Sequence, residues 1–180
     1  MKLIQHFVLI MVLNLCLNQS VYAKERMFDL DDVQNLCTTI RAGNPSDIAN
    51  RMDRLVRKAN ITKAQWNEYY VYKVYCLGSS PMYYALSKEV SDFKALADYG
   101  VDLSHPIIGD EGEVTTVKDY VINQIDTGDR SDLSKFRKIR RILKKKKAKS
   151  CADMPLLPCG KVGATYMQEA RELYYRHYQK

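Results

Sequence analysis

The sequence predicts an all-α protein of about three stacked helix pairs, closed by a C-terminal capping helix and held by two disulfides. Two observations support this fold class. Apolar residues recur every three or four positions in successive segments, which is typical of amphipathic helices that share a core. Turns rich in Gly, Asn, Asp and Pro separate these segments two by two, and such residues commonly end helices.

The N-terminus has the features of a secretory signal over residues 1–23. Lys2 supplies a positive charge, residues 3–17 are almost continuously apolar, and Val21-Tyr22-Ala23 offers a small-residue cleavage site. The apolar run is shorter than the ~20 residues of a membrane-spanning helix. We therefore expect a protein exported to the periplasm, with a single domain over residues 24–180.

The first helix pair is expected directly after the leader. Leu30–Arg41 has apolar residues at helical spacing, and Gly43-Asn44-Pro45 ends that helix. Ser46 or Asp47 is expected to cap the second helix. The second helix carries an apolar stripe of Ile48, Met52 and Leu55.

An aromatic segment, residues 59–77, follows this pair and interrupts the pattern. Gln65–Tyr70 is expected to be a short helix, and Val71–Cys76 is rich in residues that favour strands. Tyrosine and tryptophan are enriched at binding hot spots. The candidate recognition residues of the segment are Trp66, Tyr69, Tyr70 and Tyr72. The alternative is that about half of them pack into the core.

Residues 78–104 carry the most specific pattern in the chain. The first helix opens with Ser80, Pro81, Met82 and Tyr83, followed by Ala85, and the second ends at Gly100, Val101 and Asp102. This segment resembles an ankyrin repeat, in which T-P-L-H-x-A opens the first helix. The resemblance extends in weaker form over residues 30–149. It implies a scaffold that binds another protein, with Tyr83 in place of the customary histidine.

The third helix pair follows an acidic segment, residues 107–114, which is expected to be an exposed loop. Thr115 or Thr116 is expected to cap its first helix, and a basic second helix is expected over residues 133–149. The capping helix is expected over residues 164–178, because a repeat array needs a terminal element to cover its last apolar face.

The leader suggests an oxidising compartment, where an even number of cysteines indicates disulfides. The mature chain has four, Cys37, Cys76, Cys151 and Cys159, which allow three pairings. We favour Cys151–Cys159, because two prolines in the short intervening stretch suit a tight loop, and then Cys37–Cys76. Cys16 lies in the leader and lacks the preceding small residue of a lipidated cysteine. A metal site is not expected, since the mature chain has two histidines and no C-x-x-C, and no cofactor is predicted.

The positive charge of the chain is concentrated in one block. The net charge is +7, and ten of the 28 Lys and Arg residues lie between Lys135 and Lys149 with no acidic residue among them. The densest part is Lys144, Lys145, Lys146 and Lys147. This block is either a solvated helix face or a surface for an acidic protein or anionic lipid head groups. Nucleic acid is disfavoured because of the export signal.

The acidic segment is the opposite candidate surface. Asp110, Glu111 and Glu113 are placed to contact a basic patch on a partner protein or to bind calcium weakly. The ligand spacing of an EF-hand is missing. A solvated loop without a role is the alternative.

The sequence contains no G-x-S-x-G, no H-E-x-x-H and no phosphate-binding glycine loop, so no catalytic residue is predicted and an enzyme is not expected. We expect a periplasmic protein-binding module, of the kind of an immunity protein that neutralises a secreted toxic effector enzyme. The alternatives are a peripheral envelope protein held on anionic lipid by its basic helix, and an accessory protein that protects a periplasmic enzyme. The oligomeric state stays open.

Overall fold

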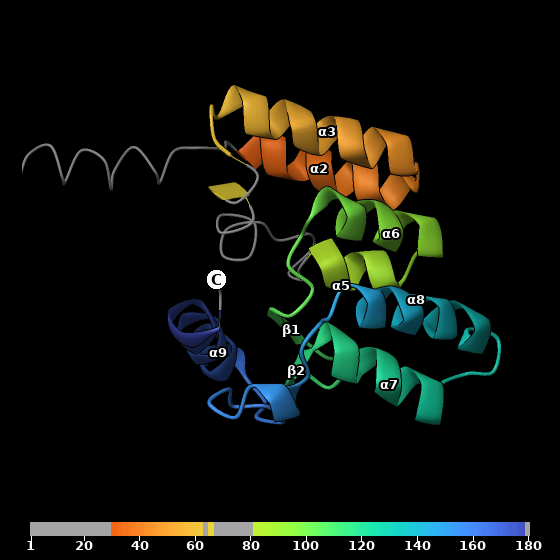
Figure 1. Ribbon diagram of the computed structural model, residues 1–180, viewed down its shortest axis with the longest axis vertical. Coiled ribbons are helices and arrows are strands. Elements are labelled where there is room, and N and C mark those ends of the chain that lie inside the picture. The colour runs from red at the N-terminus through yellow and green to blue at the C-terminus, as the bar shows by residue number, and fades with distance from the viewer. Residues whose placement is uncertain (1–29, 63–64, 67–80, 179–180) are drawn as a thin grey trace, which may run out of the picture.

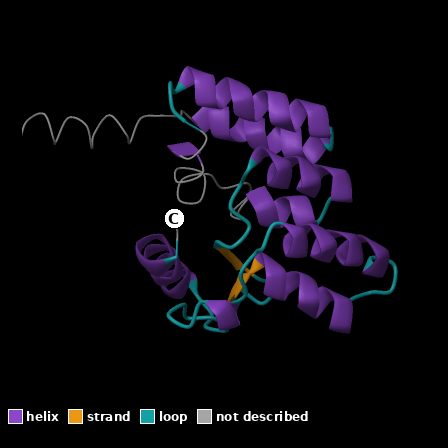
Figure 2. Ribbon diagram, in the orientation of Figure 1, coloured by secondary structure: helices purple, strands orange, loops and turns teal. Residues whose placement is uncertain are grey.

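The computed structural model describes residues 30–62, 65–66 and 81–178 of the 180-residue chain. The described part is mostly helical, with one short β-hairpin (Figure 2). Its elements are α2 (Leu30–Ala42), α3 (Pro45–Lys58), α5 (Pro81–Leu86), α6 (Val90–Tyr99), β1 (Pro106–Ile108), β2 (Val114–Thr116), α7 (Val117–Thr127), α8 (Leu133–Lys145), the 3-10 turn η1 (Cys151–Asp153) and α9 (Ala164–His177).

Six of these helices form three pairs that stack along the molecule (Figure 1). Helix α2 packs on α3, α5 packs on α6, and α7 packs on α8. The second helices also touch in sequence order, because α3 contacts α6 and α6 contacts α8, while on the other side α2 contacts α5. The described part of the chain is therefore mostly helical, as the periodicity predicted.

The α2–α3 turn differs from the prediction in its cap. Asn44 is the N-cap of α3, and its side-chain oxygen accepts a 3.1 Å hydrogen bond from the backbone amide of Ser46. Pro45 occupies the first helical turn, where its fixed φ and missing N–H are favourable. The prediction of Ser46 or Asp47 as cap is wrong, since both already lie inside the helix.

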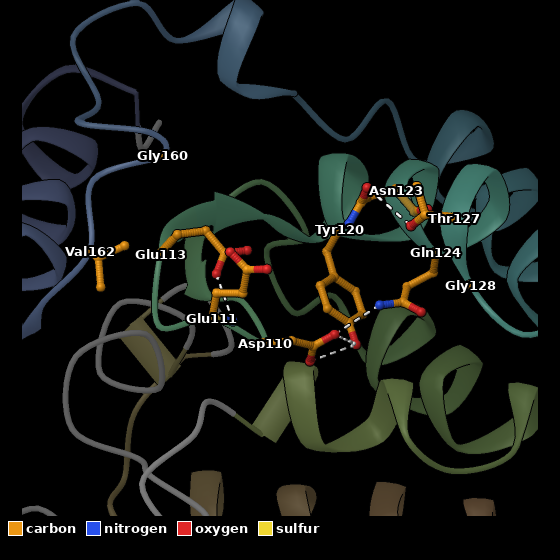
Figure 3. A pocket seen from close by; sticks show the side chains of 10 residues that line it. All are labelled: Asp110, Glu111, Glu113, Tyr120, Asn123, Gln124, Thr127, Gly128, Gly160 and Val162. Atoms are coloured by element: carbon orange, nitrogen blue, oxygen red, sulfur yellow. Dashed lines mark hydrogen bonds between the residues drawn. The ribbon is translucent and has the colours of Figure 1, made fainter.

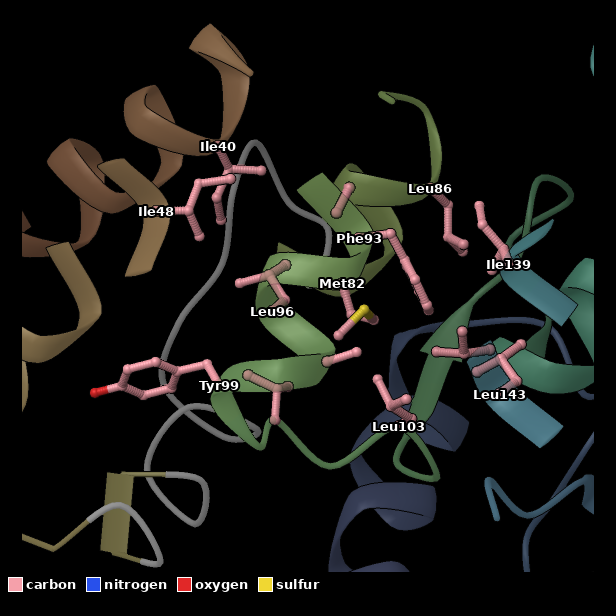
Figure 4. Packing of buried hydrophobic residues seen from close by; sticks show 14 of the residues in the cluster. Ile40, Ile48, Met82, Leu86, Phe93, Leu96, Tyr99, Leu103, Ile139 and Leu143 are labelled. Atoms are coloured by element: carbon pink, nitrogen blue, oxygen red, sulfur yellow. The ribbon is translucent and has the colours of Figure 1, made fainter. Parts of the chain in front are cut away.

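One apolar core runs through all three pairs (Figure 4). Phe93 and Leu96 of α6 lie at its centre, between the residues of α2 and α3 on one side and those of α8 on the other. Its fully buried members include Leu36, Ile40, Ile48, Met52, Met82, Phe93, Leu96, Val117, Val121 and Ile139. Because α6 contacts both neighbouring pairs, its apolar face couples them into one folding unit.

Trp66 belongs to this core as well. Its side chain is 1 % exposed, so it cannot contact a partner at the surface, and its proposed place in a recognition surface is not supported. Gln65 and Trp66 are helical, as predicted. Tyr69, Tyr70 and Tyr72 lie outside the described residues.

The predicted acidic loop is a β-hairpin, so an all-α description is incomplete. Strands β1 and β2 pair antiparallel, with Ile107 opposite Thr115. Ile107 and Val114 are buried and hold the two strands against the core. The strands were not predicted because three residues are too few to show an alternation of apolar and polar side chains. Thr116 then caps α7 by accepting a 3.1 Å hydrogen bond from the amide of Asp119, one of the two caps predicted.

The basic helix is shorter than predicted. Helix α8 ends at Lys145, not at residue 149. The backbone of Lys147 adopts a left-handed conformation, with φ of 56°. The amide of Ala148 then donates a 3.0 Å hydrogen bond to the carbonyl of Leu143, which closes the helix end.

The last helix has the predicted apolar face but a different position. Met167, Ala170 and Tyr174 of α9 are buried, in a second cluster with Val114, Met154 and Leu157. The main packing partners of α9 are β1 and β2 (Figure 1). It therefore covers the hairpin, and not the outer face of the last helix pair as the capping role required.

The C-terminal region is also held by a disulfide. Cys151 and Cys159 are bonded, which confirms this pairing. Cys37 is disulfide-bonded too, but the predicted Cys37–Cys76 pairing involves Cys76, which lies outside the described residues, as does the leader, residues 1–23.

A hydrogen bond also joins α9 to the segment that follows α6. The hydroxyl of Tyr174 donates a 2.5 Å hydrogen bond to the carboxylate of Asp102, directly after α6. Hydrogen bonds to charged acceptors contribute about 1.5–3 kcal/mol. We expect Tyr174→Phe to lower the free energy of unfolding by about that amount in urea titration, and Tyr166→Phe, an exposed position on the same helix, to leave it within about 0.5 kcal/mol. Equal stability of the two variants would show that this hydrogen bond does not contribute to holding α9.

Candidate functional site

The turn of the β-hairpin is shaped by two glycines. Gly112 has a φ of 79°, in the left-handed region that favours glycine. At Gly109 a Cβ atom would lie 1.9 Å from the carboxylate of Glu113, so a larger residue would displace that side chain. The amide of Gly109 donates a 2.9 Å hydrogen bond to the carbonyl of Glu113. These contacts hold Asp110 and Glu111 at the exposed tip.

Asp110 accepts hydrogen bonds from three donors on two helices, and Figure 3 shows two of these donors, Tyr120 and Gln124. Tyr83 of α5 donates its hydroxyl to the carboxylate. Tyr120 of α7 lies 3.2 Å from both carboxylate oxygens, and the amide of Gln124 donates at 2.9 Å. The tip of the hairpin is thereby tied to the second and third helix pairs. The acidic segment is therefore a braced turn, in which Asp110 and Glu111 stay exposed.

The two phenols that brace Asp110 resist ionisation. Burial, reinforced by the hydrogen bond and the charge of Asp110, raises the pKa of Tyr83 to about 12. Burial, together with the charges of Tyr83 and Asp110, raises the pKa of Tyr120. Their rings meet edge to face at 5.3 Å, and Tyr120 meets Phe136 of α8 at 6.4 Å. Both phenols therefore remain neutral donors at physiological pH.

A pocket of about 510 Å³ opens beside this turn. Its walls come from the hairpin turn, from α7 and from the stretch after the disulfide. That stretch meets the hairpin turn in an isolated antiparallel bridge between Glu113 and Val162. The lining residues are Asp110, Glu111, Glu113, Tyr120, Asn123, Gln124, Thr127, Gly128, Gly160 and Val162. Three carboxylates and two amides make the walls mainly hydrogen-bond acceptors of negative charge, which suits a cationic group.

All three acidic residues predicted from the sequence line this pocket, but their states differ. Asp110 is bound by side chains, whereas Glu113 accepts a 3.0 Å hydrogen bond from the backbone amide of Glu111. The carboxylate of Glu111 has no hydrogen bond or ion pair within the described part of the chain. Figure 3 shows Glu111 and Glu113 on the side of the turn away from Tyr120.

The lysines predicted as binding residues lie on a separate surface. Lys144, Lys145 and Lys147 are exposed at the end of α8. Lys146 makes a 3.1 Å ion pair with Asp98 of α6 and so helps to hold two helices together. The structure does not bring the acidic and basic candidates into one site, because none of these lysines lines the pocket.

The bracing residues of the acidic turn were not predicted. From the sequence, Tyr83 was named only for its position in the repeat-like pattern, and no role was assigned to Tyr120 or Gln124. Tyr83 lies 27 positions from Asp110. No local sequence pattern indicates a partner at that separation.

No group of three or more His, Cys, Asp or Glu residues in the described ranges is arranged to hold a metal ion. None of the described helices is long and apolar enough to span a bilayer. No protein-family model, curated protein or solved structure matches the chain, and no repeat is detected in it. The ankyrin resemblance therefore stays a prediction.

Removing the Tyr83 hydroxyl tests how the turn is braced. We expect Tyr83→Phe to cost about 1.5–3 kcal/mol of unfolding free energy at pH 7. A raised pKa adds stability that is complete below the unfolded value of about 10 and is lost as the pH rises through the folded value. The difference between wild type and Tyr83→Phe should therefore shrink between pH 10 and 12.

Urea titrations at several pH values between pH 7 and pH 12 measure this difference, with Tyr166→Phe as an exposed tyrosine control. A stability difference that stays constant over that range would contradict the coupling between the Tyr83 proton and Asp110.

Proposed function

We propose that this chain is a protein-binding module that recognises a basic group of its partner with the acidic hairpin turn. The observation that carries the proposal is the bracing of Asp110 by Tyr83, Tyr120 and Gln124 at the mouth of the pocket. A turn that is already ordered loses little conformational entropy when it binds. Glu111, exposed at the tip, supplies charge that is free to pair.

We also propose that the scaffold is ankyrin-like. The serial contacts of the second helices α3, α6 and α8 and the contact of the first helices α2 and α5 support this, as does a hairpin placed directly before the first helix of the third pair. In such a scaffold the hairpins and first helices form the binding face. The acidic turn, Tyr83 of α5 and Tyr120 of α7 would all belong to that face.

The partner we propose is a secreted toxic effector enzyme, which the chain would neutralise as an immunity protein in the periplasm. The leader-like residues 1–23 and the Cys151–Cys159 disulfide support an oxidising compartment. A rigid acidic turn can contact basic residues at the edge of the effector enzyme's active-site cleft. An accessory protein that protects a periplasmic enzyme uses the same contact without inhibition.

Affinity capture tests this proposal. We expect the chain, expressed in its own host and washed at high salt, to retain one protein at near-equal stoichiometry. Inhibition of that protein's activity supports an immunity protein, and protection of it supports an accessory protein. Retention of no protein would contradict the proposal.

Charge reversal identifies the surface. Glu111→Lys should weaken the captured complex by ten-fold or more, since like charge across an interface costs several kcal/mol. Glu169→Lys is the matched control, because it makes the same charge change at an exposed site of α9. Isothermal titration measures both. Equal weakening by the two variants would place the contact elsewhere.

A further inference from the structure

Helix α8 presents a cationic face that the protein-binding proposal does not use. Its apolar stripe, Phe136, Ile139 and Leu143, is buried in the core. On the opposite side every long side chain is cationic and exposed. This cationic face consists of Arg137, Lys138, Arg140, Arg141, Lys144 and Lys145, with Lys147 directly after the helix.

The fold accounts for other cations of this block but not for the cationic face. Lys135 pairs with Asp132 at 3.3 Å and lies over the Phe136 ring, and Lys146 pairs with Asp98. No ion pair joins any member of the cationic face to a carboxylate in the described part of the chain. Clustering like charges on one helix face disfavours the fold by mutual repulsion. The helix dipole favours cations only in the last turn.

The spacing makes the face continuous. At about 100° per residue, positions 137 to 145 place their cations within an arc of about 160°, opposite the buried stripe. With a rise of about 1.5 Å per residue the face is roughly 12 Å long. Long Lys and Arg stems can bring charges from such an arc into one plane.

We propose that the cationic face of α8 docks on the surface of an anionic lipid bilayer. The large apolar side chains that are exposed in the described part are Leu156, Val162, Tyr166 and Tyr175, and none lies on α8. The face therefore offers no buried anchor of the kind that stable protein interfaces use. It offers charge alone, and lipid phosphates supply a dense complementary charge without requiring a fixed spacing.

The position of α8 in the fold suits contact with a flat membrane surface better than insertion of the helix into a groove of a partner. Helix α8 packs against both α6 and α7 and keeps its apolar stripe in the core (Figure 1), so it lies along the body of the protein. The apolar stripe is not available to enter the acyl region, and binding is expected to depend on charge throughout. The contact therefore weakens steeply with salt.

Vesicle co-sedimentation tests the proposal with protein expressed from the full sequence and purified after natural processing. We expect vesicles of phosphatidylglycerol and phosphatidylcholine to bind the protein at about 50 mM salt and release it at about 500 mM. Vesicles of phosphatidylcholine alone should not bind it. Each cation near an anionic surface contributes roughly five-fold in affinity, so Arg141→Gln, Lys144→Gln and Lys145→Gln combined should weaken binding about a hundred-fold.

The matched control removes the same charge from other helices. Arg41→Gln, Arg54→Gln and Arg176→Gln combined change exposed positions of α2, α3 and α9 and should weaken binding less than about ten-fold. Circular dichroism should show the same helix content in both triple variants.

Three outcomes would overturn the proposal. Equal weakening by both triple variants would make net charge, and not α8, the cause. Binding that survives both high salt and the α8 substitutions would mean that contacts other than the cationic face hold the protein on the bilayer. Tighter binding to double-stranded DNA than to vesicles at the same salt would identify nucleic acid as the occupant.

Discussion

The acceptance of three hydrogen bonds by Asp110 joins parts of the molecule that otherwise meet only weakly. The second helices are connected in series through α3, α6 and α8, by apolar packing and by the ion pair of Lys146 with Asp98. On the side of the first helices, α5 and α7 are joined by the edge-to-face rings of Tyr83 and Tyr120 and by the carboxylate that both hydroxyls contact. The hairpin tip is thus part of the junction between the second and third pairs. A substitution of Asp110 will therefore also affect that junction.

The charge of the chain is divided between two elements that do not share a site. The acidic residues occupy a turn braced by side chains from two helices, and the cations occupy one face of a helix with its apolar stripe in the core. Phe136 connects the two regions physically, since it lies in the core beneath α8 and meets the Tyr120 ring. Substitutions on the exposed face of α8 do not alter this contact, so the two surfaces can be studied independently.

Periodicity predicted the helices because apolar residues at helical spacing form one continuous buried face only when the segment is an α-helix. It therefore located α2, α3, α7 and the apolar face of α9, and Thr116 was correctly named as one of two caps for α7. The hairpin was not predicted, because three-residue strands are too short to show alternation. The position of α9 was missed for a different reason. Its face was correct, but a stripe does not specify which apolar surface it covers, and here the hairpin and the disulfide loop supplied that surface.

The sequence predicted which acidic residues form the candidate site, but not that side chains from other helices hold the turn in place. Asp110, Glu111 and Glu113 were identified as one acidic group, yet a sequence cannot distinguish a solvated turn from a braced one when the donors lie 10 to 27 positions away. Trp66 is the converse case, because its residue type suggested a surface and its 1 % exposure assigns it to the core.

The two surfaces differ in rigidity, and this difference determines what each can recognise. Asp110 is held in one geometry before any partner arrives, so its contact loses little entropy on binding and can discriminate by shape. The exposed lysines of α8 carry long, rotatable side chains, which are costly to fix in one position. They suit a target that tolerates many arrangements of charge. A single partner that bound both surfaces would need a basic group in a fixed position for the acidic turn. It would also need a broad negatively charged surface for α8. Separate roles for the turn and the helix are therefore the simpler physical solution.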